Sequence, residues 1–267
     1  MQHPVVSRDE WIAARKTLLA KEKQLTRQRD QLAAERRNLP WVRIDKAYVF
    51  DGPIGKVTLV DLFDGRSQLV IQHFMFGPDW EEGCVGCSFG ADHVDSARQH
   101  FEHRDLSFAA VSRTAIAKIE AFKRRMGWRF TWVSSLGSDF NYDFGVSFTR
   151  DQLAGGMVTY NYEPVKGESE DLSGISTFYK DETGAIFHTY STFGRGDELL
   201  SPAYAYLDLA PKGRDEDGLA FSMAWVRHRD RYEPGYAVDP HALYVPPAKT
   251  AASESCPACT AMAEQEA

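Results

Sequence analysis

The chain has 267 residues, 43% of them hydrophobic and 26% charged, which suits one large domain or one domain with appendages. Residues 1–40 hold nine Lys or Arg against five Asp or Glu, so the remaining residues carry most of the acidic excess and no basic face for nucleic acid is expected there. The first ten residues lack the apolar core of a signal peptide, and no stretch approaches the roughly 20 apolar residues of a membrane span. The cytoplasm is therefore the expected compartment, with no membrane partner.

Residues 1–40 are expected to form one long helical arm. Ser7 and Glu10 have the spacing of a capping box, and no Gly or Pro follows until Pro40 supplies a stop. Apolar residues recur every seven positions: Trp11, Leu18, Leu25 and Leu32. The positions three later are mostly polar, so the pattern is half of a coiled-coil seam. We expect an amphipathic arm that lies on the domain or on a partner subunit, and a homodimer through this helix is the alternative.

Residues 41–245 are expected to form the main domain, in which strand and helix signals alternate from residue 56 onward. We expect strands at 57–60, 68–76, 106–111 and 130–133, with helices within 84–103 and at 114–126. Residues 135–174 form an insertion that the pattern does not resolve, apart from a hairpin around 157–162. A closing antiparallel hairpin follows at 175–179 and 185–190, then a helix from about 197 to 207.

This order of elements is a right-handed parallel unit finished by an antiparallel hairpin. It predicts a thioredoxin-like three-layer α/β fold, with a central mixed sheet and helices on both faces. Residues 246–267 are rich in Ala, Ser, Glu and Pro, which predicts a flexible tail.

All four cysteines fall in two Cys-x-x-Cys pairs, Cys84 with Cys87 and Cys256 with Cys259. In a reducing compartment this pattern indicates redox or metal chemistry before structural disulfides. The first pair lies where a buried strand passes into a helix, and the dipole and unpaired amides of the helix N-terminus favour a thiolate on the first cysteine. We predict that Cys84 is the nucleophile and that Cys87, one turn later, resolves the mixed disulfide.

The neighbours of this pair modify the prediction. Glu81 and Glu82 lie just upstream and would oppose thiolate formation. Ser88 and Thr260 stand where a haem attachment motif requires histidine, so no haem is expected and the chain is predicted to need no bound cofactor.

Three alternatives remain for the cysteines. Two Cys-x-x-Cys pairs could form a tetrahedral zinc site, but Cys87 and Cys256 are separated by far more than the roughly 15–20 residues of compact zinc ribbons, so no metal is assigned. The pair Cys256/Cys259 is either an inert dithiol or a shuttle that exchanges with the first pair, since tethering raises local concentration to roughly millimolar. The chain could also be a non-catalytic interaction or scaffold protein.

Several segments resemble a bacterial family of thioredoxin-like proteins described as predicted dithiol-disulfide oxidoreductases, the domain of unknown function 899 family. The matching segments are residues 39–42, 48–52, 83–88, 178–181 and 207–214. The resemblance covers roughly residues 7–245. It implies the thioredoxin-like fold, a redox-active dithiol at Cys84 and Cys87, and a thiol or disulfide substrate or a reductant protein as partner.

Two departures from related patterns concern substrate binding. Thioredoxins place a cis-proline before the strand that faces the active site, and here Ser176 stands at the expected position, beside Thr177. We take Trp80, Ser176 and Thr177 as the candidate substrate-facing residues. Peroxiredoxins carry a proline and a hydroxyl residue at set distances before the reactive cysteine, where this chain has Gly77 and Glu81, so peroxidase activity is disfavoured.

Overall fold

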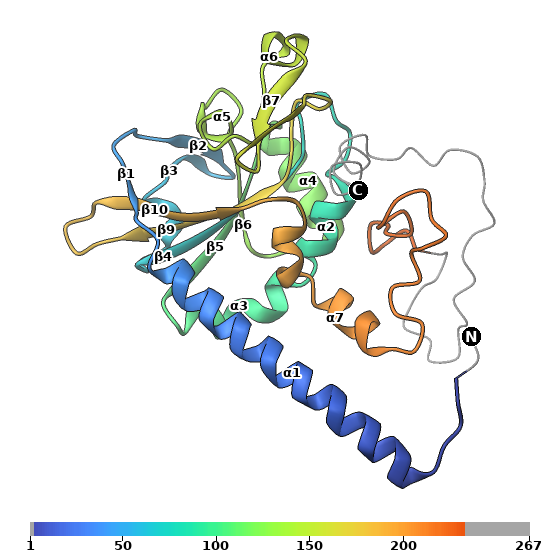
Figure 1. Cartoon of the computed structure of the whole chain (residues 1–267). Coiled ribbons are helices and arrows are strands. Elements are labelled where there is room, and N and C mark those ends of the chain that lie inside the picture. The colour runs from blue at the N-terminus through green and yellow to red at the C-terminus, as the bar shows by residue number, and fades with distance from the viewer. Residues whose placement is uncertain (1–2, 233–267) are drawn as a thin grey trace. The chain divides into compact units, whose positions relative to one another are not determined.

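The structure is a computed structural model that describes residues 3–232 (Figure 1). The chain divides into two compact units, residues 1–42 and 43–267. The predicted tail, including Cys256 and Cys259, lies outside the described residues. No helix in the described part of the chain is both long and apolar enough to cross a membrane.

The first unit contains the long helix α1 (Arg8–Arg37). It begins at the predicted capping box, in which the Glu10 amide donates to Ser7 Oγ over 3.3 Å and the Ser7 amide donates to the Glu10 carboxylate over 2.9 Å. The helix ends at Asn38, just before the predicted stop at Pro40. No residue of α1 is buried, and dimerisation through this helix stays a prediction.

The second unit is built on an eight-stranded mixed sheet in the order β1-β10-β9-β4-β5-β6-β2-β3. The strands are β1 (Val42–Ile44), β2 (Val49–Gly52), β3 (Gly55–Thr58), β4 (Gln68–His73), β5 (Leu106–Ser112), β6 (Thr131–Ser134), β9 (Gly174–Lys180) and β10 (Ile186–Thr192). Strands β4, β5 and β6 are parallel, whereas β9 is antiparallel to both β4 and β10. The predicted thioredoxin-like order is confirmed, and the β2–β3 hairpin extends the sheet beyond β6.

Helices α2 (Val85–Ala91), α3 (Val94–Glu102) and α4 (Ile116–Met126) contribute to one face of this sheet, and the short helices η1 (Asp61–Phe63) and α5 (Phe140–Asp143) contribute to the other. The segment predicted as helical between 84 and 103 is thus two helices, interrupted after Gly90 and Ala91 because glycine and aspartate have low helix propensity. The helix predicted from 197 to 207 is also two elements, η2 (Gly194–Leu200) and α7 (Pro202–Leu209). Pro202 starts α7 and disfavours helical geometry in the residue before it.

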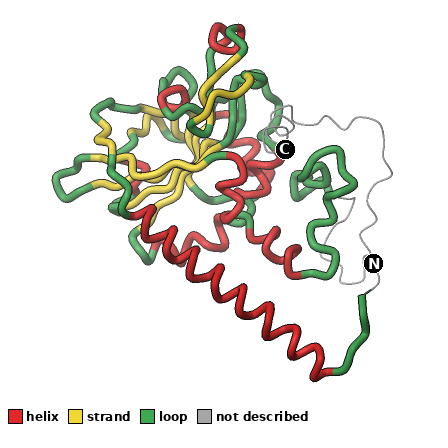
Figure 2. Tube along the Cα trace, in the orientation of Figure 1, coloured by secondary structure: helices red, strands yellow, loops and turns green. Residues whose placement is uncertain are grey.

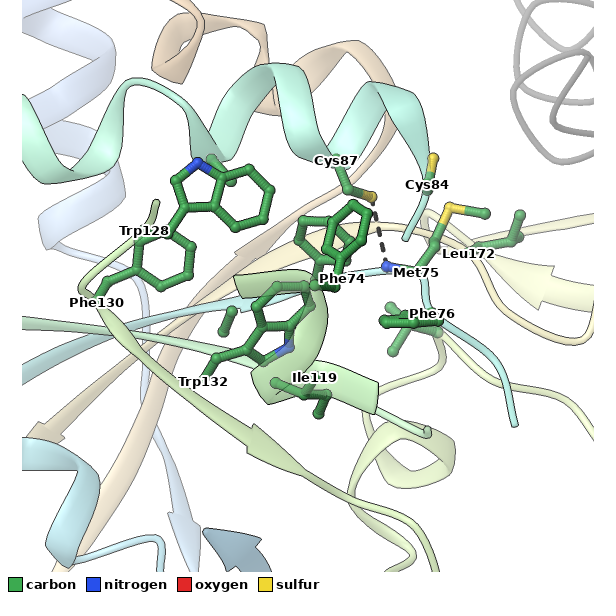
Figure 3. Close-up of a cluster of buried hydrophobic side chains, with 14 of the residues drawn as sticks. Phe74, Met75, Phe76, Cys84, Cys87, Ile119, Trp128, Phe130, Trp132 and Leu172 are labelled. Carbon is green, nitrogen blue, oxygen red and sulfur yellow. Dashed lines mark hydrogen bonds between the residues drawn. The ribbon is translucent and has the colours of Figure 1, made fainter. Parts of the chain in front are cut away.

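The side chains of β4 divide the core in two because alternate residues of a strand point to opposite faces. One core, here termed the dithiol-face core, contains both Cys84 and Cys87 (Figure 3). Phe74, which follows β4, lies in this core. Leu69 and Ile71 lie in the opposite-face core, with Phe140 from α5. Complete burial of each such side chain contributes roughly 1.5–3 kcal/mol. The two cores fix β4, and therefore the start of the loop that follows it.

The insertion between β6 and β9 contains α5, α6 (Arg150–Ala154) and a separate two-stranded sheet of β7 (Met157–Tyr160) and β8 (Glu163–Lys166). The predicted hairpin is confirmed. Its two turn residues, Asn161 and Tyr162, both have positive φ, as the tight turns of such hairpins require. Figure 2 shows that the described chain after α7 is loop, without a helix or strand up to residue 232.

Candidate dithiol site

Cys84 is the N-cap residue of α2, at the end of the loop that follows β4, and Cys87 lies in the first turn of that helix (Figure 3). Both are thiols and both are nearly buried, with exposed fractions of 4% and 6%. The backbone of Met75 holds them together: its carbonyl accepts from the Cys84 amide over 2.9 Å, and its amide donates to Cys87 Sγ over 3.4 Å. The predicted junction between a strand and a helix is therefore present, and it brings the two sulfurs to one place.

The helix that begins at Cys84 is short. α2 has seven residues, so its dipole is smaller than that of the single longer helix that the sequence suggested. Local contacts fix the geometry instead, because the Cys84 carbonyl accepts from both the amide and the hydroxyl of Ser88, over 2.9 and 2.8 Å. These contacts stabilise the first turn, and with it the spacing between the two thiols.

The two thiols differ in their chemistry. A hydrogen bond with Cys84, together with burial, raises the pKa of Cys87 well above its usual range. The amide of Met75 acts in the opposite direction but has the smaller effect. Cys87 is therefore the thiol that keeps its proton, as a resolving cysteine must until the mixed disulfide forms.

Residues 77–83, here termed the dithiol loop, are held at both ends by side chains from elsewhere in the fold. Lys118 Nζ of α4 donates to the carbonyls of Pro78 and Trp80, over 3.2 and 2.9 Å. At the other end, His228 Nε2 lies 2.9 Å from the Gly83 carbonyl, which can only accept, so this ring nitrogen carries the proton. The residue before Cys84 is thus fixed by a buried imidazole.

The acidic residues of the loop are compensated. Glu82 accepts from Arg125 Nη1 over 2.6 Å and from Arg231 Nη1 over 2.8 Å, while Glu81 is highly exposed and lies 3.7 Å from Lys118. The expectation that Glu82 opposes a thiolate on Cys84 needs correction, because two guanidinium groups balance its charge.

The three predicted substrate-facing residues lie in different places. Trp80 is half-buried in the dithiol loop and packs against the dithiol-face core. Thr177 lies on β9 opposite Val70, in the middle of β4, and its hydroxyl is bonded to that of Thr189 on β10. The structure brings Trp80, but not Thr177, to the dithiol.

Ser176 does not face the dithiol. Its side chain is fully buried and is paired with Ile71 on the opposite face of the sheet, where its hydroxyl lies 2.8 Å from His73 Nε2. Alternation along the strand explains this placement, since a residue directly opposite Ile71 shares its face. The residue that reaches the dithiol from this part of the chain is Leu172, just before β9, which lies beside Met75 (Figure 3).

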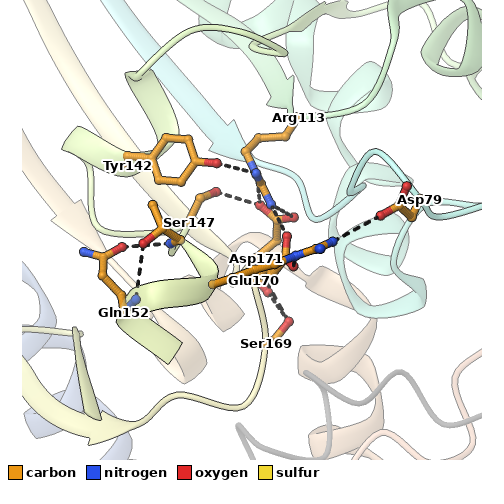
Figure 4. Close-up of polar contacts among 10 residues, drawn as sticks. Asp79, Arg113, Tyr142, Ser147, Gln152, Ser169, Glu170 and Asp171 are labelled. Atoms are coloured by element: carbon orange, nitrogen blue, oxygen red, sulfur yellow. Dashed lines mark hydrogen bonds and ion pairs between the residues drawn. The ribbon is translucent and has the colours of Figure 1, made fainter. Parts of the chain in front are cut away.

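A second polar cluster lies at the Gly77 end of the dithiol loop (Figure 4). Arg113, directly after β5, makes a bidentate ion pair with Asp171, at 2.7 and 2.9 Å, and both side chains are buried. Ser147 Oγ donates to the same carboxylate over 2.6 Å. Burial opposes the charge of Arg113, but its bonds to Asp171 raise its pKa. The guanidinium therefore stays charged, and its N–H groups donate to partners within the protein.

Sequence patterns did not indicate several residues that build this site. Met75, Leu172 and His228 carry no chemical motif, and their contacts with the dithiol loop join positions up to 145 residues apart. The one available signal was Gly77-Pro78, which predicts a turn where the strand ends and therefore a loop before Cys84. Within residues 3–232, no three His, Cys, Asp or Glu side chains gather as a metal site. Zinc bound by both cysteine pairs would involve residues outside that range.

The sequence matches, over residues 1–232, the family described as "Bacterial protein of unknown function (DUF899)". No curated protein matches it. Among solved structures, a peroxiredoxin Q variant from Xanthomonas campestris is similar with a TM-score of 0.40 and 16% identity, over 60% of this chain and 91% of that one. Peroxidoxin BcpB from Mycobacterium tuberculosis has a TM-score of 0.40 and 14% identity, over 60% and 93%. A putative thiol:disulfide interchange protein DsbE from Chlorobium tepidum has a TM-score of 0.38 and 13% identity, over 63% and 97%.

Proposed function

We propose that this chain, which belongs to the bacterial DUF899 family, is a dithiol-disulfide oxidoreductase that acts through Cys84 and Cys87. One observation carries the proposal. Cys87, with its raised pKa, is hydrogen-bonded to Cys84, and the backbone of Met75 contacts both residues. Two thiols in contact, one of which retains its proton, are arranged for sequential attack.

In the reducing direction, the Cys84 thiolate attacks one sulfur of a substrate disulfide. The Cys84–substrate bond forms, the substrate S–S bond breaks, and the leaving sulfur takes up a proton. Cys87 then loses its proton and attacks Cys84 Sγ, which releases the second substrate thiol. The substrate gains two electrons and two protons, and the enzyme is left with a Cys84–Cys87 disulfide that another thiol system must reduce.

The surroundings of the dithiol suit this chemistry in a reducing compartment such as the cytoplasm, without a bound cofactor. The charge of Glu82 is compensated, and Trp80 and Leu172 pack in the same core as the two thiols, where we place the substrate contact. Because both sulfurs are nearly buried, a substrate must present its disulfide on a narrow segment or the dithiol loop must open locally.

The test is to trap the intermediate. In cells that express Cys87→Ser, partners should accumulate as mixed disulfides on Cys84, visible as reducible bands on non-reducing gels and identified by mass spectrometry. The matched control, Cys84→Ser, should give none, since Cys87 is the protonated thiol. If Cys87→Ser yields no adduct under normal or oxidising conditions, the redox proposal is wrong and a scaffold role takes its place.

A further inference from the structure

We infer that the outward side of α7 is a docking surface for an apolar segment of a polypeptide substrate, an incompletely folded protein that carries the disulfide reduced by Cys84 and Cys87. The inference rests on the proposed function and names the substrate class of that site. The docking surface, here termed the α7 outer face, consists of Pro202, Ala205, Tyr206 and Leu209.

α7 is apolar on both of its sides. Its inner face packs in one cluster with Phe89 of α2 through three residues, Ala203, Tyr204 and Leu207. The residues of the α7 outer face recur at spacings of three and four, so they form one stripe along the helix, and all of them are exposed. Tyr206 and Leu209 are 76% and 87% exposed. A helix that is hydrophobic all round is normally buried, so an apolar stripe left in water indicates an interaction surface.

The charges around α7 select an apolar partner segment. Asp208 is the only charged residue of α7, and its carboxylate accepts two bonds from Arg214, both of 2.8 Å. Arg214 also donates to Glu198 and lies over the ring of Tyr204, 4.0 Å from its centroid. A charged segment would therefore find no free counter-charge on α7, whereas an apolar segment would be removed from water there.

The α7 outer face is close enough to the dithiol to hold a substrate. Val85, the residue after Cys84, packs against the same cluster as the inner face of α7. α7 therefore lies beside the start of α2, and its outer face is about one helix diameter, roughly 10–12 Å, farther out. An extended chain covers that distance in about three or four residues, at roughly 3.3–3.6 Å each.

The burial of the dithiol favours an extended polypeptide as the occupant. Cys84 and Cys87 are only 4% and 6% exposed, so a bulky folded surface cannot approach either sulfur closely. A low-molecular-weight disulfide is too short to contact α7 and Cys84 together. An incompletely folded protein presents both a narrow chain and exposed apolar segments. Binding of such a segment to α7 raises the concentration of a neighbouring disulfide at Cys84.

The experiment compares three disulfide probes on the reduced full chain, freed of other reductant. Two are disulfide-linked peptide dimers that differ only at about four residues on either side of the cysteine, where one carries Leu-Phe-Leu and the other Ser-Ser-Ser. The third is hydroxyethyl disulfide, which is too small to contact α7. Mass spectrometry of quenched samples gives the rate of thiol oxidation. The wild-type chain should react roughly tenfold faster with the apolar peptide than with the serine peptide, because docking buries large apolar side chains.

The decisive variant combines Tyr206→Ser and Leu209→Ser. Because both side chains are largely exposed, the fold should be retained, and the rate with hydroxyethyl disulfide should equal that of the wild-type chain. The preference for the apolar peptide should disappear. Ile54→Ser is the matched control, since Ile54 is fully exposed in the turn between β2 and β3, and it should leave the preference unchanged.

The outcomes separate this inference from the proposed function. If the double variant keeps the preference, or the wild-type chain shows none, the inference is wrong, while oxidation by hydroxyethyl disulfide leaves the function standing. Light scattering during gel filtration tests the rival occupant: a wild-type dimer that the double variant converts to a monomer would assign the surface to a second copy and overturn the inference. If none of the three probes oxidises the thiols, the proposed function itself fails.

Discussion

Two charged clusters lie at opposite ends of the dithiol loop, and they differ in burial. At the Gly77 end, Arg113 and Asp171 have side chains only 9% and 6% exposed and are joined by two bonds. At the Cys84 end, Glu82 is held by Arg125 and Arg231, whose side chains are 26% and 56% exposed. The first cluster is inside the protein and the second is at its surface.

The difference indicates separate roles. Removing one partner of a buried pair leaves an uncompensated charge in a poorly solvated place, which costs about 3–5 kcal/mol. A surface pair contributes roughly 0–1 kcal/mol, because water solvates either partner alone. We therefore expect the Arg113 cluster to stabilise the fold and the Glu82 cluster, with His228, to position the residues next to Cys84.

Asp171→Asn is the strongest way to break this comparison. It should lower the free energy of unfolding by about 3–5 kcal/mol, since the buried Arg113 loses its counter-charge. Urea unfolding followed by circular dichroism measures this. Asp79→Asn is the matched control: its carboxylate is 91% exposed and lies 4.0 Å from Arg150, so the unfolding midpoint should not move. Equal midpoints for the two variants would show that the buried pair has no special role.

His228→Phe tests the other cluster and should have a smaller effect. The ring would still pack near Phe122, but the Gly83 carbonyl would lose its donor. A lost hydrogen bond of about 1–1.5 kcal/mol corresponds to roughly tenfold faster amide exchange in residues 79–84. His228→Gln retains an N–H donor and should restore most of the protection, while α3 should exchange normally in both variants. Unchanged exchange in His228→Phe would remove the positioning role.

The comparison also shows what the sequence could predict. Local sequence signals, namely hydrophobic periodicity and the positions of capping residues, Gly and Pro, predicted three features. These are the order of strands and helices along the chain, the capping box at Ser7 and the placement of Cys84 at a helix start. The compensation of Glu82 was not, because Arg125 and Arg231 come from distant segments. Local sequence reported only the two acidic neighbours.

Ser176 illustrates a different limit. Its strand was predicted, but a shift of one residue in a strand moves a side chain to the other face. The observed pairing of Ser176 with Ile71 shows that the Ser176 side chain points away from the dithiol. Leu172, just before β9, is the residue that packs in the same core as the two thiols. A site assembled from loops and strand ends depends on register, which periodicity alone does not fix.

The central claim is that Cys84 and Cys87 have unequal thiols. Limiting iodoacetamide on the reduced full chain, followed by peptide mass spectrometry from pH 6 to 9, tests it directly. Because the hydrogen bond with Cys84 and burial raise the pKa of Cys87, its thiol should stay protonated across this range, and alkylation should fall on Cys84 first at every pH. Preferential labelling of Cys87, or equal labelling of the two, would contradict the account.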